Sequence, residues 1–320
     1  MKKNILIIFL GVFTIASLAM FAGCKKAETN LKFATGGTAG TYYPYGMELA
    51  KIFNSKIPGL NVLVQSTGAS IENIGLVRDK KADIAIVQND VSSYAFDGVR
   101  LFDGEPVKGI ATIATLYMEV VQIAVSSESK INSIKDMKGK RISVGDAGSG
   151  GEANAEQILA ASNLTFNDIA VKHLSFKDTG HAFQIGEIDG FFITSGIPNV
   201  AIQDIAETKS IKILPIGQQE INQLISEYSF YIPHRIQKDA YKGVTADVPT
   251  VAVKASLIVR ADLDEKIVYE MTKAMFENRA EITKATEKGR ELDISEAIKG
   301  ISTPLHPGAR KYYTEKGVLK

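Results

Sequence analysis

Short apolar runs alternate along this chain with segments in which apolar residues recur every three or four positions. A short apolar run bounded by turn residues is typical of a buried strand, and the longer recurrence is typical of a helix packed on one face. The predicted strands are Leu31–Ala34, Asn61–Gln65, Asp83–Val87, Val120–Val125, Arg141–Val144, Gly190–Thr194, Ile211–Leu214 and Ser256–Val259. Strands that alternate with helices favour α/β lobes with mostly parallel sheets.

The first predicted helix runs from about Pro44 to Phe53, with Pro44 in its first turn and Gly46, Met47, Ala50 and Phe53 toward the core. Further helices are predicted after residues 66–70, after Gln88-Asn89-Asp90 and through Phe96, near Glu152–Ala161, near Asn199–Thr208 and at about Leu263–Thr283. For the last of these we expect Asp262 to cap the amino end with its carboxylate.

The amino-terminal segment has the pattern of a secretory leader. Lys2 and Lys3 precede an apolar run from Ile5 to Ala22, and Gly23-Cys24 follows. Ala22-Gly23-Cys24 is similar to a bacterial lipobox, so we expect residues 1–23 to be removed, Cys24 to be lipidated and residues 24–30 to form a tether. The alternative is a retained membrane anchor, since the run approaches the ~20 residues that span a bilayer.

Composition narrows the function. The formal net charge of +1 becomes −1 once Lys2 and Lys3 are removed with the leader. The chain therefore has no excess of positive charge that would indicate binding to nucleic acid. The remaining length suits one large core or two lobes. Cys24 is the only cysteine, so a lipidated chain has no free thiol or disulfide in an oxidising compartment.

Polar or glycine-rich segments directly follow several predicted strands. They are residues 36–42, 66–70, 88–89, 145–152 and 195–196. In open α/β sheets, ligands bind outside the carboxyl ends of the strands. Glycines let backbone N–H groups converge, and a helix amino end adds partial positive charge, which suits a carboxylate or phosphate. Two such cradles from separate halves of the chain predict a site closed around one small molecule.

Each of these segments has a purely structural interpretation as well. A glycine-rich turn from strand to helix is often only a tight turn. Tyr42 and Tyr43 pack in the core or line a pocket with their hydroxyls. Gln88 and Asn89 cap the next helix or face a ligand, and the pattern leaves both open.

Enzyme interpretations have little support. Residues 148–153 fit a relaxed dinucleotide fingerprint, with Asp168 at a suitable distance, but residues 145–147 separate it from its strand. Ser149 lies in a variant of the serine nucleophile elbow, yet no histidine is singled out as its partner. There is no HExxH or paired-cysteine motif. We therefore expect no catalysis, no cofactor and no metal.

At several points the chain resembles the TAXI family, the TRAP-associated extracytoplasmic immunogenic proteins, which are solute receptors of tripartite ATP-independent periplasmic (TRAP) transporters. The matching segments are residues 35–44, 66–74, 82–90, 138–150, 189–198, 247–253 and 304–308, in the family's order. Gly151 departs from the pattern, because many relatives carry a larger residue there.

The resemblance implies an α/β, two-lobed periplasmic-binding-protein fold of type II, with a ligand cleft between the lobes. Residues 31–121 plus 253–320 would form lobe one, and residues 122–252 would form lobe two, joined by Val120–Val125 and Val251–Val259. It also implies a small organic anion or amino acid, glutamate-like or a dicarboxylate, as solute, a TRAP-type permease as membrane partner, and a monomer. The expected location is extracytoplasmic and lipid-anchored, in a periplasm or on the outer face of the cytoplasmic membrane.

We expect capture by lobe closure, with the solute held by N–H and hydroxyl groups rather than by arginine, since Arg78 and Arg141 lie only at the margins of candidate loops. The candidate ligand-binding residues are Gly37, Thr38, Thr41, Tyr42 and Gln88 on lobe one, and Ser149, Gly150, Gly151, Glu152, Thr194 and Ser195 on lobe two. Glu152 binds an ammonium or only favours its helix amino end. A ligand sensor that signals to a membrane kinase is the alternative function.

Overall fold

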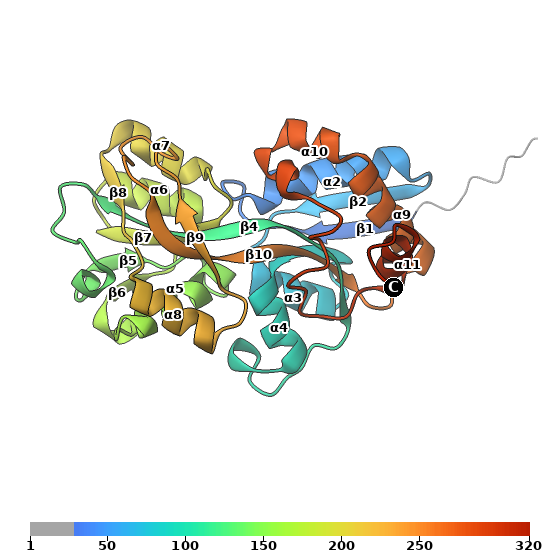
Figure 1. Ribbon diagram of the computed structural model, residues 1–320, viewed down its shortest axis with the longest axis horizontal. Helices are drawn as coiled ribbons and strands as arrows, with labels where there is room; N and C mark the ends of the chain where they lie inside the picture. Colours follow the sequence, from blue (N-terminus) through green and yellow to red (C-terminus); the bar gives the residue numbers. More distant parts are fainter. Residues whose placement is uncertain (1–28) are drawn as a thin grey trace, which may run out of the picture.

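Two long antiparallel strands, β4 (Ile110–Ser126) and β10 (Val248–Arg260), run through the whole molecule in this computed structural model, which describes residues 29–320. They pair from Val120 opposite Ala252 to Ile110 opposite Arg260. One end of each strand lies in each lobe, so a single sheet continues through both (Figure 1). The predicted leader, Cys24 and most of the predicted tether lie outside the described residues.

The sheet has ten strands among the described residues, and the main path runs β2-β1-β3-β10-β4-β7-β5-β6, with β8 beside β4 and β9 beside β10. The first third of the chain and its carboxyl end contribute β1 (Thr29–Ala34), α2 (Tyr42–Lys56), β2 (Leu60–Gln65), α3 (Ser70–Arg78), β3 (Ile84–Gln88), α4 (Asn89–Asp97), η2 (Arg100–Phe102), α9 (Glu265–Glu277), α10 (Arg279–Ala285), η5 (Glu287–Glu291) and α11 (Pro307–Glu315). This is lobe one, on the right in Figure 1.

The intervening segment forms lobe two, on the left in Figure 1. Its elements are η3 (Ile134–Met137), β5 (Arg141–Ser143), α5 (Gly150–Ala161), η4 (Phe166–Asp168), β6 (Ala170–Lys172), α6 (Phe176–Gln184), β7 (Gly190–Ser195), α7 (Val200–Thr208), β8 (Ile211–Ile213), α8 (Gln218–Glu227) and β9 (Ile232–Ile236). Strands β5, β6 and β7 are parallel to one another, as β1, β2 and β3 are in lobe one. The expected α/β fold with a two-lobed form is therefore confirmed.

Alternating side chains divide the core of each lobe between the two faces of the sheet. On β3, Ile84 and Ile86 join a cluster with α2, α9 and α11, whereas Ala85 and Val87 join a cluster with α3 and α4. Consecutive strand residues point to opposite faces, so this fully buried strand contributes to both cores. In lobe two, Val121 and Ile123 of β4 likewise belong to one cluster and Val120 to another.

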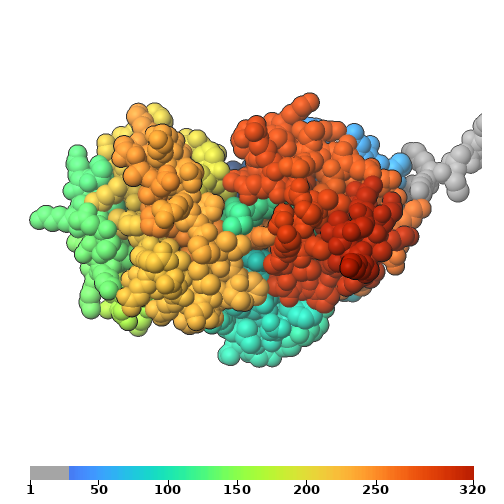
Figure 2. All heavy atoms as spheres, viewed as in Figure 1, coloured from blue at the N-terminus to red at the C-terminus, as the bar shows by residue number. Residues whose placement is uncertain are grey.

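Figure 2 shows a groove between the two rounded masses, with the crossing strands visible at its bottom. The core clusters of lobe one draw on residues up to 117 and beyond 255, and those of lobe two lie between 120 and 253. The domain boundaries stated above stay a prediction. Within residues 29–320, no helix has both the length and the apolar character that crossing a membrane requires.

Some details differ from the expectation. Strand β4 begins ten residues before the predicted Val120, because its buried first half, including Thr112 and Thr115, continues the same ladder. Met47 is 46% exposed, so it does not face the core, although Gly46, Ala50 and Phe53 are buried there. Helices α6, α8 and α11 and strands β6 and β9 were not predicted.

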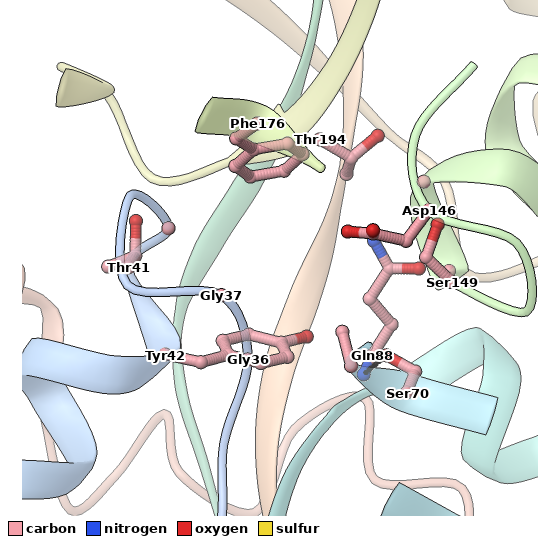
Figure 3. Close-up of a pocket in the computed structure, with 14 residues that line it drawn as sticks. Gly36, Gly37, Thr41, Tyr42, Ser70, Gln88, Asp146, Ser149, Phe176 and Thr194 are labelled. Atoms are coloured by element: carbon pink, nitrogen blue, oxygen red, sulfur yellow. Dashed lines mark hydrogen bonds between the residues drawn. The ribbon is translucent and has the colours of Figure 1, made fainter. Parts of the chain in front are cut away.

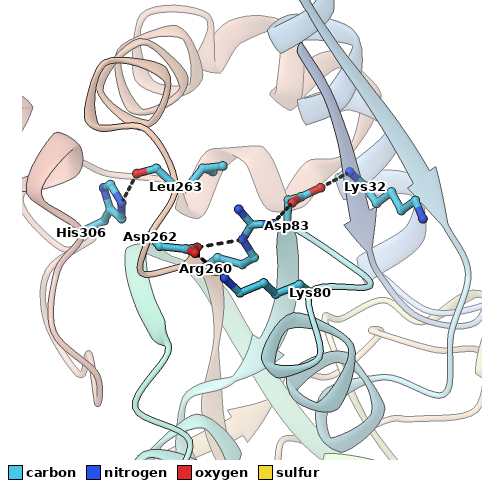
Figure 4. Close-up of polar contacts among 7 residues, drawn as sticks. All are labelled: Lys32, Lys80, Asp83, Arg260, Asp262, Leu263 and His306. Atoms are coloured by element: carbon cyan, nitrogen blue, oxygen red, sulfur yellow. Dashed lines mark hydrogen bonds and ion pairs between the residues drawn. The ribbon is translucent and has the colours of Figure 1, made fainter.

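The long helix predicted at 263–283 is two helices, α9 and α10, which meet at Asn278. Asp264, rather than the predicted Asp262, caps α9 by accepting from Ile267 N at 2.9 Å. Asp262 instead pairs with Arg260 and Lys80, as Figure 4 shows. It lies two residues before the cap position, too early to reach the free N–H groups of the helix.

A polar cluster connects the strands at the outer end of lobe one, and its members are Lys32, Lys80, Asp83, Arg260 and Asp262 (Figure 4). The Asp83 carboxylate accepts from Lys32 N at 2.8 Å and from the Arg260 guanidinium at 2.8 Å, which joins β1, β3 and the end of β10. Among these groups Arg260 and Asp83 are the least exposed. Polar pairs of this kind between neighbouring strands help to fix the register of the strands, here at the end of the lobe away from the cleft.

Candidate ligand-binding site

A pocket lies between the two lobes at the carboxyl ends of their parallel strands, where the sequence predicts it. Its empty space, counted together with the part that is open to solvent, is about 510 Å³. Lobe one contributes Gly36, Gly37, Gly40, Thr41, Tyr42, Ala69, Ser70 and Gln88, and lobe two contributes Asp146, Ser149, Gly150, Gly151, Phe176 and Thr194. Figure 3 shows the labelled side chains of the two lobes facing one another across the pocket.

Five helices begin at the pocket wall. Thr41 and Tyr42 open α2, Ala69 and Ser70 open α3, and Gln88 precedes α4. In lobe two, Ser149 and Gly150 open α5, and α6 begins at Phe176. The first N–H groups of a helix have no intrahelical acceptor, and each amino end carries about half a positive charge. The pocket is therefore polarised to hold an anion.

The first glycine loop lets the backbone itself form the wall of lobe one. Gly40 N donates to Gly37 O at 2.9 Å, which folds the loop into a turn just before α2. A side chain on Gly37 would meet no atom within 4 Å, so this residue borders open space. Gly46 allows α2 to lie close to β1, because a Cβ there would be 2.5 Å from Thr35.

The second loop is fixed by hydrogen bonds within lobe two. Ser149 Oγ accepts from Glu152 N at 3.1 Å, and the Glu152 carboxylate accepts from Gly148 N at 2.6 Å. Gly145 and Gly148 have φ of 99° and 74°, which only glycine adopts readily. These contacts turn the chain sharply out of β5 and present the amino end of α5 to the pocket.

Two buried polar atoms of the pocket wall have no hydrogen-bond partner within the described chain. They are Gln88 Oε1 and Thr194 Oγ1, from residues that are 2% and 5% exposed. Leaving such a group unpaired costs about 1–3 kcal/mol. A polar solute that supplies a donor to Gln88 Oε1 and any polar partner to Thr194 Oγ1 would remove this cost.

Carboxyl groups are the ionisable side chains closest to the pocket. Asp146 lines it and is half-buried; burial raises its pKa above the usual range, and the charges of Asp178 and Glu72 add to this. Behind the wall, Tyr42 Oη donates to the buried Glu119 carboxyl at 2.6 Å. Neither lysine nor arginine is among the lining residues in the part of the chain that the structure describes.

A buried polar network connects the two lobes behind Gln88. Gln88 Nε2 donates to Asn154 Oδ1 at 3.1 Å, and Asn154 Nδ2 donates to Asp90 at 3.0 Å and to Tyr231 Oη at 3.0 Å. Burial raises the pKa of Asp90 to about 6. Gln88 and Asp90 lie on lobe one and Asn154 on lobe two, so their bonds to Asn154 join the lobes, whereas the bond from Asn154 to Tyr231 lies within lobe two.

The structure brings eight of the eleven predicted ligand residues to the pocket wall: Gly37, Thr41, Tyr42, Gln88, Ser149, Gly150, Gly151 and Thr194. Their role as ligand contacts stays a prediction. Thr38 is not among the lining residues. Ser195 Oγ is buried in bonds with Gln122 and Gly196 O. The Glu152 carboxylate is engaged by Gly148 N and by His173 at 2.7 Å, which favours the helix-end interpretation.

Six lining residues were not predicted individually: Gly36, Gly40, Ala69, Ser70, Asp146 and Phe176. The first five lie in loops that the sequence pattern singles out, so the pattern finds the loops but not the facing side. Phe176 carries no such signal, although its ring would be 3.5 Å from a Cβ on Gly40.

The open question about Gln88 and Asn89 has a clear structural answer. Neither side chain caps α4: Gln88 makes no cap hydrogen bond and faces the pocket. Asn89 instead accepts from Lys254 N at 2.9 Å and donates to Gly300 O at 3.0 Å. Arg78 and Arg141 pair with Asp79 and Asp189, away from the pocket.

The serine of the elbow-like motif takes part in a helix cap. Ser149 Oγ is the cap of α5, and the nearest histidine of this cluster, His173, contacts Glu152. Among residues 29–320 there is no group of three or more His, Cys, Asp or Glu side chains that could hold a metal ion.

Comparison with solved structures supports the fold. The alkanesulfonate-binding protein SsuA from Xanthomonas axonopodis pv. citri, bound to MOPS, is 15% identical with a TM-score of 0.51, over 84% of this chain and 82% of that one. A Listeria monocytogenes protein described as an L-cystine ABC transporter is 17% identical with a TM-score of 0.52, over 81% and 95%. A structure described as a periplasmic transporter is 14% identical with a TM-score of 0.58, over 90% and 93%.

At these identities the likeness concerns the fold alone. The sequence itself gives a more specific result, because the NMT1-like family model matches residues 33–317, nearly all of the described chain. The finer TAXI assignment is not confirmed by these matches. With its two lobes around a polar pocket, the chain belongs to the NMT1-like family and has the fold of periplasmic solute-binding proteins.

Proposed function

We propose that this protein is an extracytoplasmic receptor that captures a small organic anion or amino acid by lobe closure and delivers it to a membrane permease. The observation that carries the proposal is the pocket itself, which takes its wall from both lobes. A solute in this position contacts both lobes at once and so favours the closed form, which is the standard route from binding to a change of shape.

The amino ends of five helices support a carboxylate as one group of the solute. Gly150 and Gly151 lie in the first turn of α5, so their backbone N–H groups have no acceptor within the helix. Helix α2 presents the same kind of free amino end from the opposite lobe. Such ends bind anions without an arginine. This agrees with a lining set of glycines, hydroxyls and amides.

An ammonium group also has candidate partners at the pocket wall, close to the same loop of lobe two. Asp146 offers a carboxylate, and Gln88 Oε1 is a buried acceptor that lacks a donor. A glutamate-like amino acid supplies both a carboxylate and an ammonium, whereas a dicarboxylate supplies only the former. We therefore rank amino acids first and dicarboxylates second.

For the membrane partner we propose a TRAP-type permease, on the basis of the sequence motifs that resemble the TAXI family. An ABC-type permease is the competing partner, because a structural relative is described as an ABC transporter protein. A sensor that signals to a membrane kinase would use the same closing fold. These possibilities can be separated by measuring the uptake of labelled solute. The cells compared should lack this protein, the TRAP-type permease, or the ATPase of an ABC-type transporter.

We also propose that Cys24 carries the lipid that holds the receptor at the membrane, a residue outside the described part of the chain. Cys24→Ser should release the protein from the membrane fraction and abolish incorporation of labelled fatty acid.

A thermal-shift screen of residues 25–320 tests the solute class. The panel should contain amino acids, dicarboxylates, 2-oxo acids, sugars and nucleotides. A solute at about 100 times its dissociation constant adds ~2.7 kcal/mol of stability. Stabilisation by an amino acid or dicarboxylate supports the proposal. Stabilisation by sugars or nucleotides alone contradicts it.

A further inference from the structure

A buried carboxyl group lies directly behind the pocket wall. Glu119 is in the crossing strand β4, opposite Val253 of β10, and is 2% exposed. Tyr42 Oη is 2.6 Å from Glu119 Oε2, and Tyr42 lines the pocket. This carboxyl is therefore bonded to a side chain of the pocket wall.

The charged and titratable groups around Glu119 come from four elements. Helix α2 contributes Tyr42, α4 contributes Asp90, and η5 contributes Lys288, while β4 itself contributes Tyr117. Lys288 Nζ is bonded to Glu291 Oε1 at 2.5 Å rather than to Glu119. Within residues 29–320, Tyr42 is the side chain that hydrogen-bonds the Glu119 carboxyl, and no cation forms a salt bridge with it.

A buried carboxylate without a cation is costly, so the neutral acid is the favoured form. Burial raises the pKa of Glu119 to about 8, and Asp90 acts in the same direction, while the Tyr42 hydrogen bond and the charge of Lys288 oppose it. Burial also raises the pKa of Tyr42 well above its usual value. Tyr42 and Glu119 are therefore joined by a hydrogen bond, and neither side chain carries a charge at neutral pH.

We infer that Glu119 is a proton-holding residue at neutral pH, and that this proton keeps the wall behind Tyr42 uncharged so that the pocket accepts an anion. The inference concerning the solute rests on the proposed function. The helix amino ends supply only partial charges. An ionised Glu119 at this depth would oppose them through a medium of low dielectric constant.

Proton uptake on binding is the consequence. A bound carboxylate raises the pKa of Glu119 further, because like charges disfavour one another. At a pH where the free protein has partly ionised Glu119, solute binding should therefore draw a proton from solution. Above that pH the affinity for an anion should fall, by up to about tenfold per pH unit for one coupled proton.

The solute-free protein gives the first test. Carbon-13 NMR of side-chain-labelled glutamate follows each carboxyl between about pH 5 and pH 10, and the resonance absent from Glu119→Gln identifies Glu119. We expect a midpoint near 8. A midpoint below about pH 7 would overturn the inference whether or not any solute is known, because the carboxyl would then be mostly ionised at neutral pH. Glu128→Gln is the control, because it makes the same change at an exposed carboxyl just beyond β4.

The second test is titration calorimetry with L-glutamate and with succinate, each in two buffers of different ionisation enthalpy. Near pH 8, where the free carboxyl is about half ionised, we expect up to about half a proton to be taken up per solute by the wild type and by Glu128→Gln. Glu119→Gln should take up none, and its dissociation constant should lose the pH dependence. Binding without proton uptake, and with the same pH dependence in Glu119→Gln, contradicts the inference. If neither probe binds but the NMR midpoint is near 8, the proposed solute class is wrong and the proton-holding role stands.

Discussion

Gln88 on lobe one donates its side-chain amide to Asn154 on lobe two at 3.1 Å, at the back of the pocket. The same Asn154 side chain donates to Asp90 and to Tyr231 and is fully buried. Gln88 also lines the pocket with an unpartnered oxygen. One side chain thus contacts the space for the solute and the network that closes the lobes, so binding and closure are linked through it.

Asn154→Ala should weaken solute binding more than it weakens the fold of either lobe. It removes the bond to Asp90, which joins the lobes and so belongs to the closed form, at a cost of roughly 2 kcal/mol for a bond to a charged group. The bond to Tyr231 is lost in the open and the closed form alike, because both residues lie on lobe two. We expect a dissociation constant raised by at least about tenfold. Asn222→Ala on the exposed face of α8 is the matched control. Equal affinities for the two variants would show that the network does not hold the lobes together.

His306 predicts a loss of stability at acidic pH. Its Nε2 donates to Leu263 O at 3.0 Å, and its Nδ1 accepts from Gly308 N at 3.2 Å as the cap of α11. Only the neutral ring can do both, and burial lowers its pKa. A folded pKa below the unfolded one means that this stability is complete above the unfolded pKa of about 6.5 and is lost as the pH falls below it.

The comparison for this residue is His306→Asn, because asparagine can still cap a helix but does not titrate. Denaturant unfolding at several pH values should show the wild type losing stability relative to this variant below about pH 6.5. A difference that stays constant with pH would mean that the ring does not titrate in this range.

The edge of the sheet in lobe one is covered by a single side chain. Asn54 of α2 donates to Val62 O at 3.1 Å and accepts from Val62 N at 2.6 Å, so it pairs both backbone groups of that residue on the edge strand β2. Asn54→Ala should cost about 1–3 kcal/mol of unfolding free energy. It also exposes an unpaired edge beside Leu63, which is 55% exposed, and so favours association between chains.

Asn61→Ala tests whether that loss is specific. Asn61 lies on the same strand but only joins Asn30 in an exposed side-chain pair at 2.7 Å. We expect a change of no more than about 0.5 kcal/mol in chemical denaturation, as for most surface substitutions. Equal losses for the two variants would remove the special role of Asn54.

Much of this fold could be predicted from local patterns, because apolar runs and glycine-rich loops mark the strands and their carboxyl ends. The loops around Gly37 and Ser149 were found in this way, and both line the pocket. The patterns say less about which side chains of a loop point into the pocket. Thr38 and Ser195 lie in the right loops, but Ser195 is buried among Gln122 and Gly196.

Other features depend on contacts between distant segments and leave no local trace. Glu119 is the one charged residue of β4, and only the fold brings Tyr42 to it from 77 positions away. Asn154 reads as an ordinary polar residue of a helix, yet it is fully buried where the lobes meet. At α9, two aspartates precede the helix, and only the backbone position of Asp264 lets its oxygen reach Ile267 N.

The central claim, that a solute is held by closure of the two lobes, is tested most directly at two neighbouring glycines. A Cβ on Gly150 would overlap Gln88 Oε1, whereas the nearest atom to a Cβ on Gly151 is Ser149 Oγ at an ordinary 3.6 Å. Both substitutions place alanine in the first turn of α5, so their effects on the helix itself are matched.

The measurement is the binding isotherm of whichever solute stabilises the wild type most, repeated with Gly150→Ala and Gly151→Ala. Gly150→Ala must either rotate Gln88 away from Asn154 or keep the lobes apart, so we predict at least about a tenfold loss of affinity. Gly151→Ala should bind within about threefold of the wild type. Wild-type affinity in Gly150→Ala would contradict closure of the two lobes around the solute.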